Sequence, residues 1–254
     1  MTTKTDAAAT HREPELLGQT VVVIGGSAGI GLETARRARA EGAEVVLAAR
    51  DPERLERAAA EVDARSTAAF DATNPAALKD FFDGLPGRID HVMVTGPGPR
   101  YGPMLEMDSD ELRLVLSDHV VLALEVARNA ASKMRPGGTL IFMGGTAGRR
   151  VSRELGIVSA ATAVLPPFVA ALALELAPVR ANLIAAGFVD TPLSASYFPT
   201  SDDLEKRREQ LRATLPIGRV VGPADVAALA VHIMTNTALS GATYDIDGGQ
   251  QFIT

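Results

Sequence analysis

Hydrophobic positions along the chain fall into short apolar runs that alternate with longer segments of helical spacing. Seven runs rich in Val, Ile, Leu and Ala are predicted as strands, at residues 20–24, 44–49, 67–70, 91–95, 139–143, 181–185 and 243–246. After the first run, Leu32, Ala35 and Ala38 recur at the spacing of one helical face. Strands that alternate with helices predict an α/β fold with a doubly wound parallel sheet of about seven strands and helices on both faces.

Polar residues mark where several of these helices begin and end. Asp51 and Asn74 each stand directly before a proline, which is typical of a capped helix start. Asp108 and Glu111 have the spacing of a capping box, and Gly42 is placed to end the first helix.

The loop between the first strand and the first helix is rich in glycine. We expect Gly25 to close the strand with backbone angles that a side chain would oppose. Gly29 would let the main chain approach a pyrophosphate, and Gly31 would let the helix pack closely on the sheet. Such a pattern also occurs in ordinary turns, but here a strand precedes it and a helix follows, which favours a phosphate site. The residues expected to contact the cofactor in this loop are Gly25, Ser27, Ala28, Ile30 and Gly31.

Two irregular segments follow predicted strands, at residues 96–107 and 190–203. Ligands bind outside the carboxyl ends of the strands in doubly wound sheets. We therefore expect these two loops on the substrate side of the cleft.

Composition adds limits to this picture. The 254 residues show no break that would divide them, so we expect a flexible tail at 1–17 and a single domain at 18–254. The net charge of −6, without a dense basic run, argues against nucleic acid and membrane partners. The chain has no cysteine, and its four histidines are scattered, so no metal site is expected. The N-terminal residues lack an apolar core, which favours a cytoplasmic location, and the apolar segment 160–173 is read as a buried helix, too short to cross a bilayer.

With these features placed, the chain resembles the short-chain dehydrogenase/reductase (SDR) family, whose fold is Rossmann-like, over about residues 18–252. Members carry Thr-Gly-x-x-x-Gly-Ile-Gly, and the chain has Ile24 in the Thr place followed by the matching glycines. Asp71-Ala72 looks like the family's adenine contact, residues 187–192 look like its Pro-Gly-x-x-x-Thr segment, and residues 247–249 match its Asp-Gly-Gly. The resemblance adds Asp71, Ala72, Gly96, Val189 and Thr191 to the expected cofactor contacts.

The end of the second strand bears on the choice of cofactor. An NAD site needs a carboxylate there, whereas the chain has Ala49 followed by Arg50. A guanidinium suits a 2′-phosphate, so NADP(H) is favoured over NAD(H). In the alternative interpretation, Arg50 is a solvated residue beside Asp51, and Asp71 is only a cap of a helix or turn.

The family's catalytic residues are a Tyr, a Lys four positions later, a Ser and an Asn. By the resemblance, these positions hold Val158, Thr162, Gly145 and His119. Nowhere in the sequence does a Lys follow a Tyr by four positions, and the wider spacing of the related enoyl reductases is absent too. Pro166 and Pro167 lack the N–H groups that would continue the helix, which therefore either kinks there or begins near Leu165.

Two residues are candidates to replace the missing groups. His119 could act as an acid or hydrogen-bond donor, or it could be a satisfied core residue. Tyr101 could supply a phenol whose pKa the adjacent Arg100 lowers, or it could cover apolar surface.

Other polar groups near the same place are less specific. The hydroxyls of Thr146, Ser159 and Thr162 lack a base that would activate them. The cluster of Arg149, Arg150 and Arg153 could receive an acidic group or could be solvated.

Two functions remain open. The first is a divergent NADP(H)-dependent oxidoreductase acting on a small carbonyl or alcohol. The second is a protein of the same fold that binds the nucleotide as a sensor, a partner subunit or a non-redox enzyme. In either case the apolar helices near residues 108–134 and 158–177 predict a homo-oligomer, a dimer or a tetramer.

Overall fold

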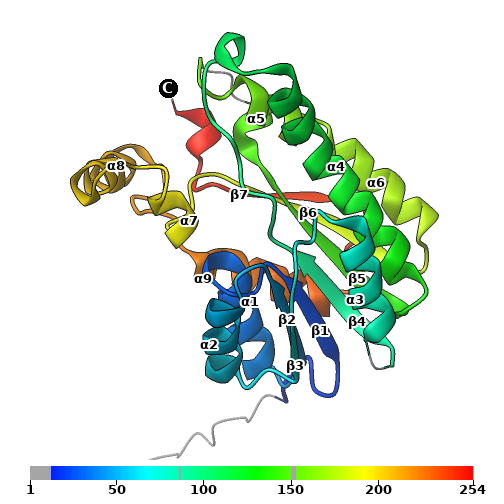
Figure 1. The fold of residues 1–254 in the computed structure, drawn as a ribbon. Coiled ribbons are helices and arrows are strands. Elements are labelled where there is room, and N and C mark those ends of the chain that lie inside the picture. The colour runs from blue at the N-terminus through cyan, green and yellow to red at the C-terminus, as the bar shows by residue number, and fades with distance from the viewer. Residues whose placement is uncertain (1–12, 86, 150–152, 254) are drawn as a thin grey trace, which may run out of the picture.

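The computed structural model describes residues 13–85, 87–149 and 153–253. Its centre is a parallel sheet of seven strands in the order β3-β2-β1-β4-β5-β6-β7 (Figure 1). The strands are β1 (Thr20–Ile24), β2 (Glu44–Ala49), β3 (Ser66–Ala69), β4 (Ile89–Val94), β5 (Met134–Gly145), β6 (Arg180–Ala186) and β7 (Thr243–Ile246). Strand β1 pairs with both β2 and β4, so the strand order reverses there, which creates the crevice where doubly wound sheets bind ligands.

Helices connect the strands and cover both faces of the sheet. They are α1 (Gly29–Ala40), α2 (Pro52–Val62), α3 (Pro75–Gly84), α4 (Ser109–Ala131), α5 (Gly156–Ala163), α6 (Leu165–Glu175), α7 (Pro192–Ala195), α8 (Ser201–Thr214) and α9 (Pro223–Thr235). Helices α1, α2 and α9 pack on one face, and α3, α4 and α6 pack on the other (Figure 1). The expected fold class is confirmed.

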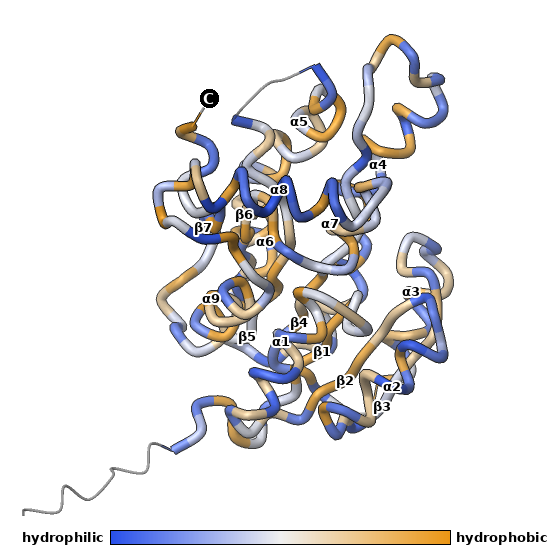
Figure 2. Tube along the Cα trace, turned by 90° about the vertical axis from the view of Figure 1, so that its left-hand side faces the viewer, coloured by the Kyte–Doolittle hydropathy of each residue, from blue (hydrophilic) through white to orange (hydrophobic). Residues whose placement is uncertain are grey.

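Apolar strand residues occupy the centre of both layers. One set of buried strand residues packs against α3, α4 and α6: Val22, Val92 and Leu140. The other set packs against α1 and α9: Val23, Met93 and Ile141. Successive side chains of a strand point to opposite faces, which explains why continuous apolar runs are needed. In Figure 2 these strands are coloured as hydrophobic in the interior of the molecule, whereas α8 is mostly hydrophilic.

Four strands, β3, β4, β5 and β6, differ from their predicted bounds, and β5 differs most. β5 begins at Met134 and ends at Gly145, because its last residues pair with β6 up to the Gly145–Ala186 position. Pro136 and two glycines interrupt the apolar pattern at its start, so the sequence does not reveal this part. At Gly138 an added Cβ would lie 2.2 Å from the Asp90 carbonyl oxygen, so close strand packing requires the glycine.

The helix starts at Asp51 and Asn74 are confirmed, since each side chain accepts main-chain N–H bonds of its helix. Asp108 likewise caps α4, but Glu111 does not complete the expected capping box. Its carboxylate instead lies 3.6 Å from the Arg100 guanidinium.

The expected tail at 1–17 is too long. Residues 1–12 lie outside the described residues, but Leu16 is buried in the core layer of α1 and its N–H donates to the Glu41 carbonyl oxygen at 2.9 Å. Residues 13–17 therefore pack with the folded part of the chain. The irregular segment expected at 190–203 is also partly helical, because Thr191 caps α7 and Thr200 caps α8.

The apolar segment near residue 165 forms two helices that meet at Val164. The second begins at Leu165, as Pro166 and Pro167 predict. Together the run Gly156–Glu175 has 20 residues, so by length and composition it could cross a membrane, which corrects the expectation that the segment is too short. The same composition is typical of a core helix, and Leu165, Val169 and Leu172 pack in the layer of α4.

Candidate functional site

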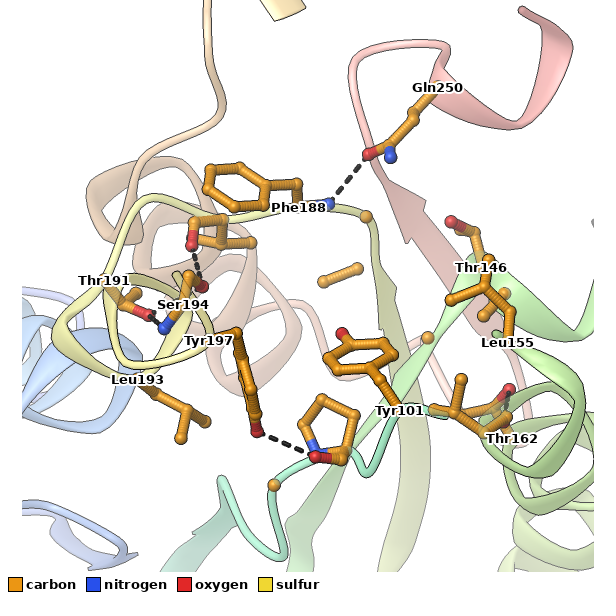
Figure 3. Close-up of a pocket in the computed structure, with 18 of the residues that line it drawn as sticks. Tyr101, Thr146, Leu155, Thr162, Phe188, Thr191, Leu193, Ser194, Tyr197 and Gln250 are labelled. Atoms are coloured by element: carbon orange, nitrogen blue, oxygen red, sulfur yellow. Dashed lines mark hydrogen bonds between the residues drawn. The ribbon is translucent and has the colours of Figure 1, made fainter. Parts of the chain in front are cut away.

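A cavity of about 680 Å³ opens at the carboxyl ends of the strands. The loops after β4, β5 and β6 line it, together with α5, α7, α8 and the segment that follows β7 (Figure 3). Apolar side chains form most of its wall, among them Met143, Leu155, Leu193 and Phe198. Such a largely apolar hollow with a few polar groups is typical of a small-molecule site.

The glycine loop lies beside this cavity, with Ile30 in the cavity wall. Gly25 has a φ of +87°, and a Cβ there would lie 2.1 Å from the Thr95 hydroxyl oxygen. At Gly31 a Cβ would lie 2.2 Å from the Gly25 carbonyl oxygen, so the helix packs against the loop as expected. At Gly29, Thr191 approaches instead, since a Cβ would lie 3.3 Å from the Thr191 Cβ.

The N-terminus of α1 suits an anion. Its N-cap residue is Ala28, no side chain accepts a bond from the first N–H groups, and its first turn holds no acidic residue. The partial positive charge of the helix end is therefore directed at the loop without a side-chain partner among the described residues. This arrangement could hold a phosphate.

Arg50 and Asp71 lie after β2 and β3, at the same edge of the sheet as the loop. Arg50 is exposed, and no described residue forms an ion pair or hydrogen bond with it. Asp71 accepts bonds from the N–H and hydroxyl of Thr73, at 3.0 and 2.8 Å, and these bonds hold the pKa of its carboxyl below the usual value. Asp71 is thus the turn cap of the alternative interpretation, with its second oxygen still available.

The cavity collects most of the residues expected at the reacting end of the site. From the sequence-based set it includes Ile30, Tyr101, His119, Gly145, Val158, Thr162, Val189 and Thr191. Gly96 lines a small apolar cavity next to it, which also shares His119. The remaining expected cofactor contacts, Gly25, Ser27, Ala28, Gly31, Arg50, Asp71 and Ala72, lie outside the cavity in the loop and at the neighbouring strand ends.

His119 on α4 is buried, and its Nδ1 lies 3.1 Å from the Val115 carbonyl oxygen. Because a carbonyl accepts, Nδ1 carries the proton and Nε2 is left as an acceptor. Burial lowers the pKa of His119, so the ring is neutral near pH 7. His119 can therefore accept a hydrogen bond at Nε2, but it is a weak base and is poorly suited to the expected role of acid.

Tyr101 lies in the loop after β4, and its phenol is not activated as expected. Burial is the largest cause that raises the pKa of Tyr101, to about 12, and Tyr197 raises it further. Arg100 does not lower it, since that guanidinium lies 3.6 Å from Glu111. The phenol is therefore a donor near neutral pH and not a base.

The neighbouring hydroxyls of α5 are already engaged. Ser159 donates to the Ala147 carbonyl oxygen at 2.8 Å, and Thr162 donates to the Val158 carbonyl oxygen at 2.7 Å. Thr146, at the end of β5, lines the cavity and has no hydrogen-bond partner among the described residues. Of the three hydroxyls considered from the sequence, Thr146 alone retains a free donor within the described part of the chain.

Sequence reasoning missed the contribution of α8. Arg207, Gln210, Leu211 and Thr214 have the spacing of one helix face, and all four line the cavity. Arg208 fixes this helix to the loop after β6 through two bonds to Asp190, at 2.9 and 2.8 Å. The helix was not recognised as a wall because most of its residues are charged and its apolar positions are few.

The basic cluster after β5 is not free. Arg149 forms an ion pair with Asp245, and Arg150 lies outside the described residues. Where side chains are described, no group of three His, Asp or Glu residues lies close enough together to hold a metal ion.

Known proteins match most of this chain in sequence and in fold. The family described as enoyl-(acyl carrier protein) reductase matches residues 25–251. The short-chain dehydrogenase/reductase ATR9 of Stachybotrys chlorohalonatus is 26% identical over 93% of this chain and 98% of its own. The crystal structure of BdcA in complex with NADPH has a TM-score of 0.82 and 24% identity over 92% of this chain and 95% of its own. MalC reductase/Diels-Alderase from Malbranchea aurantiaca has a TM-score of 0.87 and 20% identity over 94% of this chain and 99% of its own. Since the matched family and the fold cover nearly all described elements, the chain belongs to the short-chain dehydrogenase/reductase family of oxidoreductases.

Proposed function

We propose that this protein is an NADP(H)-dependent oxidoreductase of divergent type, acting on a small carbonyl or alcohol without the family's Tyr–Lys pair. The observation that carries this proposal is a glycine-rich loop at an uncapped helix start, beside a largely apolar cavity. The bound nicotinamide would supply the hydride chemistry.

The residues present fit such a cofactor. The N–H groups at the start of α1 can receive the pyrophosphate, and the exposed Arg50 can receive a 2′-phosphate. Ala49 puts no carboxylate there to repel it. The complex of BdcA with NADPH, which has the same fold, supports the choice of NADP(H).

The positions of Val158 and Thr162 support the divergent assignment. Both lie on α5, four residues apart, and both line the cavity, so the break at Val164 does not move them away from it. Gly145 lies opposite, where an added Cβ would contact the Thr162 methyl group at 3.4 Å. Val, Thr and Gly at these positions provide no base and no cation.

The chain's own groups could still move a proton. His119 Nε2 can accept one, whereas Thr146 and Tyr101 can donate hydrogen bonds to a developing oxygen charge. Water in the open cavity is the remaining proton source.

Purified protein tests the proposal. It should oxidise NADPH when a panel of small aldehydes and ketones is added, as measured by loss of absorbance at the nicotinamide band. We expect slow turnover, about 10²- to 10⁴-fold below an enzyme with a positioned acid, because that is the usual contribution of such a group. Tight NADPH binding with no oxidation across the panel would contradict redox function.

Tight NADPH binding without oxidation would support the second candidate, a protein that binds the nucleotide without redox chemistry. The lining of the cavity favours this candidate, because its described residues include no lysine. The name of MalC, reductase/Diels-Alderase, also joins this fold to a non-redox reaction in another protein. Val158→Tyr combined with Thr162→Lys should leave NADPH binding intact. The double variant would create turnover only if α5 points these two side chains at the cofactor as the same helix does in the family.

We also propose that the protein forms a homo-oligomer, a dimer or a tetramer, through α4, α5 and α6. Leu114 and Val121 on α4 and Val164 and Leu174 at α5–α6 are exposed, although all are large and apolar. Helices α4, α5 and α6 lie against one another (Figure 1). Large apolar residues exposed on neighbouring helices are typical of a surface that another chain covers.

A further inference from the structure

Most hydroxyl groups that line the cavity already donate a hydrogen bond within the protein. Five donate to main-chain carbonyl oxygens: Thr95, Thr162, Ser194, Tyr197 and Thr214. Thr191 shares a hydrogen bond with Ser194. Two lining hydroxyls differ, those of Tyr101 and Thr146, because no described residue is within hydrogen-bond distance of either one. The Tyr101 hydroxyl points into the cavity (Figure 3). The Tyr101 phenol is thus a donor available to a ligand.

The Tyr101 ring is held in place by Tyr197. The two rings meet edge to face, with centroids 4.9 Å apart and an interplanar angle of 88°. The Tyr197 hydroxyl in turn donates to the Pro99 carbonyl oxygen at 2.7 Å. These contacts join the loop after β4 to the segment that follows α7, across the cavity (Figure 3).

Gly98 leaves little room beside this contact. An added Cβ at Gly98 would lie 3.2 Å from both the Tyr197 hydroxyl oxygen and the Leu193 Cδ2. These two side-chain ends would have to shift by a few tenths of an ångström to admit it, so a side chain at position 98 would crowd the Tyr197 hydroxyl.

The surroundings of the phenol indicate what it could bind. Leu155, Val158 and Leu193 form apolar wall in the same cavity. Tyr101 is 47% exposed, and burial of the rest of its side chain raises the pKa of the phenol to about 12, so the hydroxyl stays protonated near neutral pH. A protonated phenol in an apolar cavity favours a ligand that has an apolar body and one hydrogen-bond acceptor.

We propose that Tyr101 donates a hydrogen bond to the carbonyl oxygen of an apolar ligand in this cavity, and that Tyr197 is the residue that positions it. The proposal rests on the proposed function for its substrate class, an apolar aldehyde or ketone. It adds the group that recognises the carbonyl oxygen. It requires no turnover, because it concerns binding alone.

Two probes of similar shape test it on the full-length protein: acetophenone, which has an acceptor oxygen, and ethylbenzene, which has none. Their dissociation constants can be measured by saturation-transfer NMR, without turnover. We expect Tyr101→Phe to weaken acetophenone binding about 2- to 10-fold and to leave ethylbenzene unchanged, as for the loss of one hydrogen bond. Tyr244→Phe is the matched control, since Tyr244 lies on β7 outside the cavity wall.

The positioning role of Tyr197 has a separate readout. Tyr197→Phe should also weaken acetophenone, and the double variant with Tyr101→Phe should bind no more weakly than Tyr101→Phe alone. Additive losses would show that Tyr197 does not act through Tyr101 and would overturn its role. Equal acetophenone affinity in wild type and Tyr101→Phe, or no acetophenone binding up to its solubility, would overturn the whole inference. Absence of NADPH oxidation would instead count against the proposed function only.

Discussion

Arg50 is the residue on which the proposed choice of NADP(H) depends. It is exposed at the end of β2, and no ion pair with a described residue has to be broken before its guanidinium can meet a phosphate. We expect Arg50→Ala to raise the dissociation constant of NADPH about 10-fold, the lower end of the range for a charged hydrogen bond, because solvent screens an exposed group. NADH binding should not change.

Fluorescence titration of both nucleotides measures this difference. Arg54→Ala is the matched control, because Arg54 is also exposed but lies on α2, 3.8 Å from Asp51. An equal loss for NADPH and NADH in Arg50→Ala would show that Arg50 does not read the 2′-phosphate.

His91 on β4 bears on stability and not on the site. Its Nε2 lies 2.7 Å from the Gln19 side-chain oxygen, and its Nδ1 is buried without a partner in the described structure. Burial lowers the pKa of His91 from 6.5 to about 3. Between pH 6.5 and about pH 3, His91 is protonated in the unfolded chain and neutral in the folded chain. The free energy of unfolding therefore falls as the pH falls below 6.5.

We therefore expect the free energy of unfolding to drop by about 3 kcal/mol between pH 6.5 and pH 4 through this one group. Urea unfolding at several pH values measures it. His91→Gln should be less stable at pH 7 but should lose less of its stability on acidification, whereas His232→Gln, on the exposed face of α9, should behave like wild type. The same acid slope in His91→Gln as in wild type would refute this assignment.

At the scale of elements, the bounds of a strand or helix could be predicted where neighbouring residues in the sequence determine them. Strands β1 and β2 match their predicted bounds because continuous apolar runs with clear ends specify them. Strand β7 matches through an alternation of polar and apolar residues. The break before Leu165 is also local, since prolines remove N–H groups of the helix itself. The start of β5 is not, because Gly138 is required by the Asp90 main chain of a neighbouring strand.

The site divides in the same way. The glycine loop could be predicted because the backbone angles and close approaches that need its glycines arise within the loop itself. The tautomer of His119 could not be predicted, since Val115 lies one turn away only after the helix forms. The high pKa of Tyr101 could not be predicted either, since it comes first from burial and then from Tyr197, 96 positions further along the chain. The role of α8 as a wall is likewise set by the pair Arg208–Asp190, which charge patterning alone does not assign.

At the scale of the whole molecule, the exposed apolar residues of α4 and α6 have to be covered or solvated. Leu114 and Val121 lie seven positions apart, on one face of α4, and Leu174 on α6 is 84% exposed. Exposing such a patch to water costs free energy that a second chain would recover, at about 25 cal/mol per Å² of apolar surface buried. We expect light scattering at micromolar concentration to give the mass of at least two chains.

The double variant Leu114→Glu/Val121→Glu should then be monomeric, because an interface would have to bury two unpaired carboxylates. Its thermal unfolding should also become independent of protein concentration, since association stabilises the folded state only when it occurs. Leu17→Glu is the control: Leu17 is also apolar and exposed, but it lies before β1, far along the chain from α4. Wild-type protein with the mass of one chain, or a double variant that stays oligomeric, would place the contact elsewhere and leave this apolar face without its proposed partner.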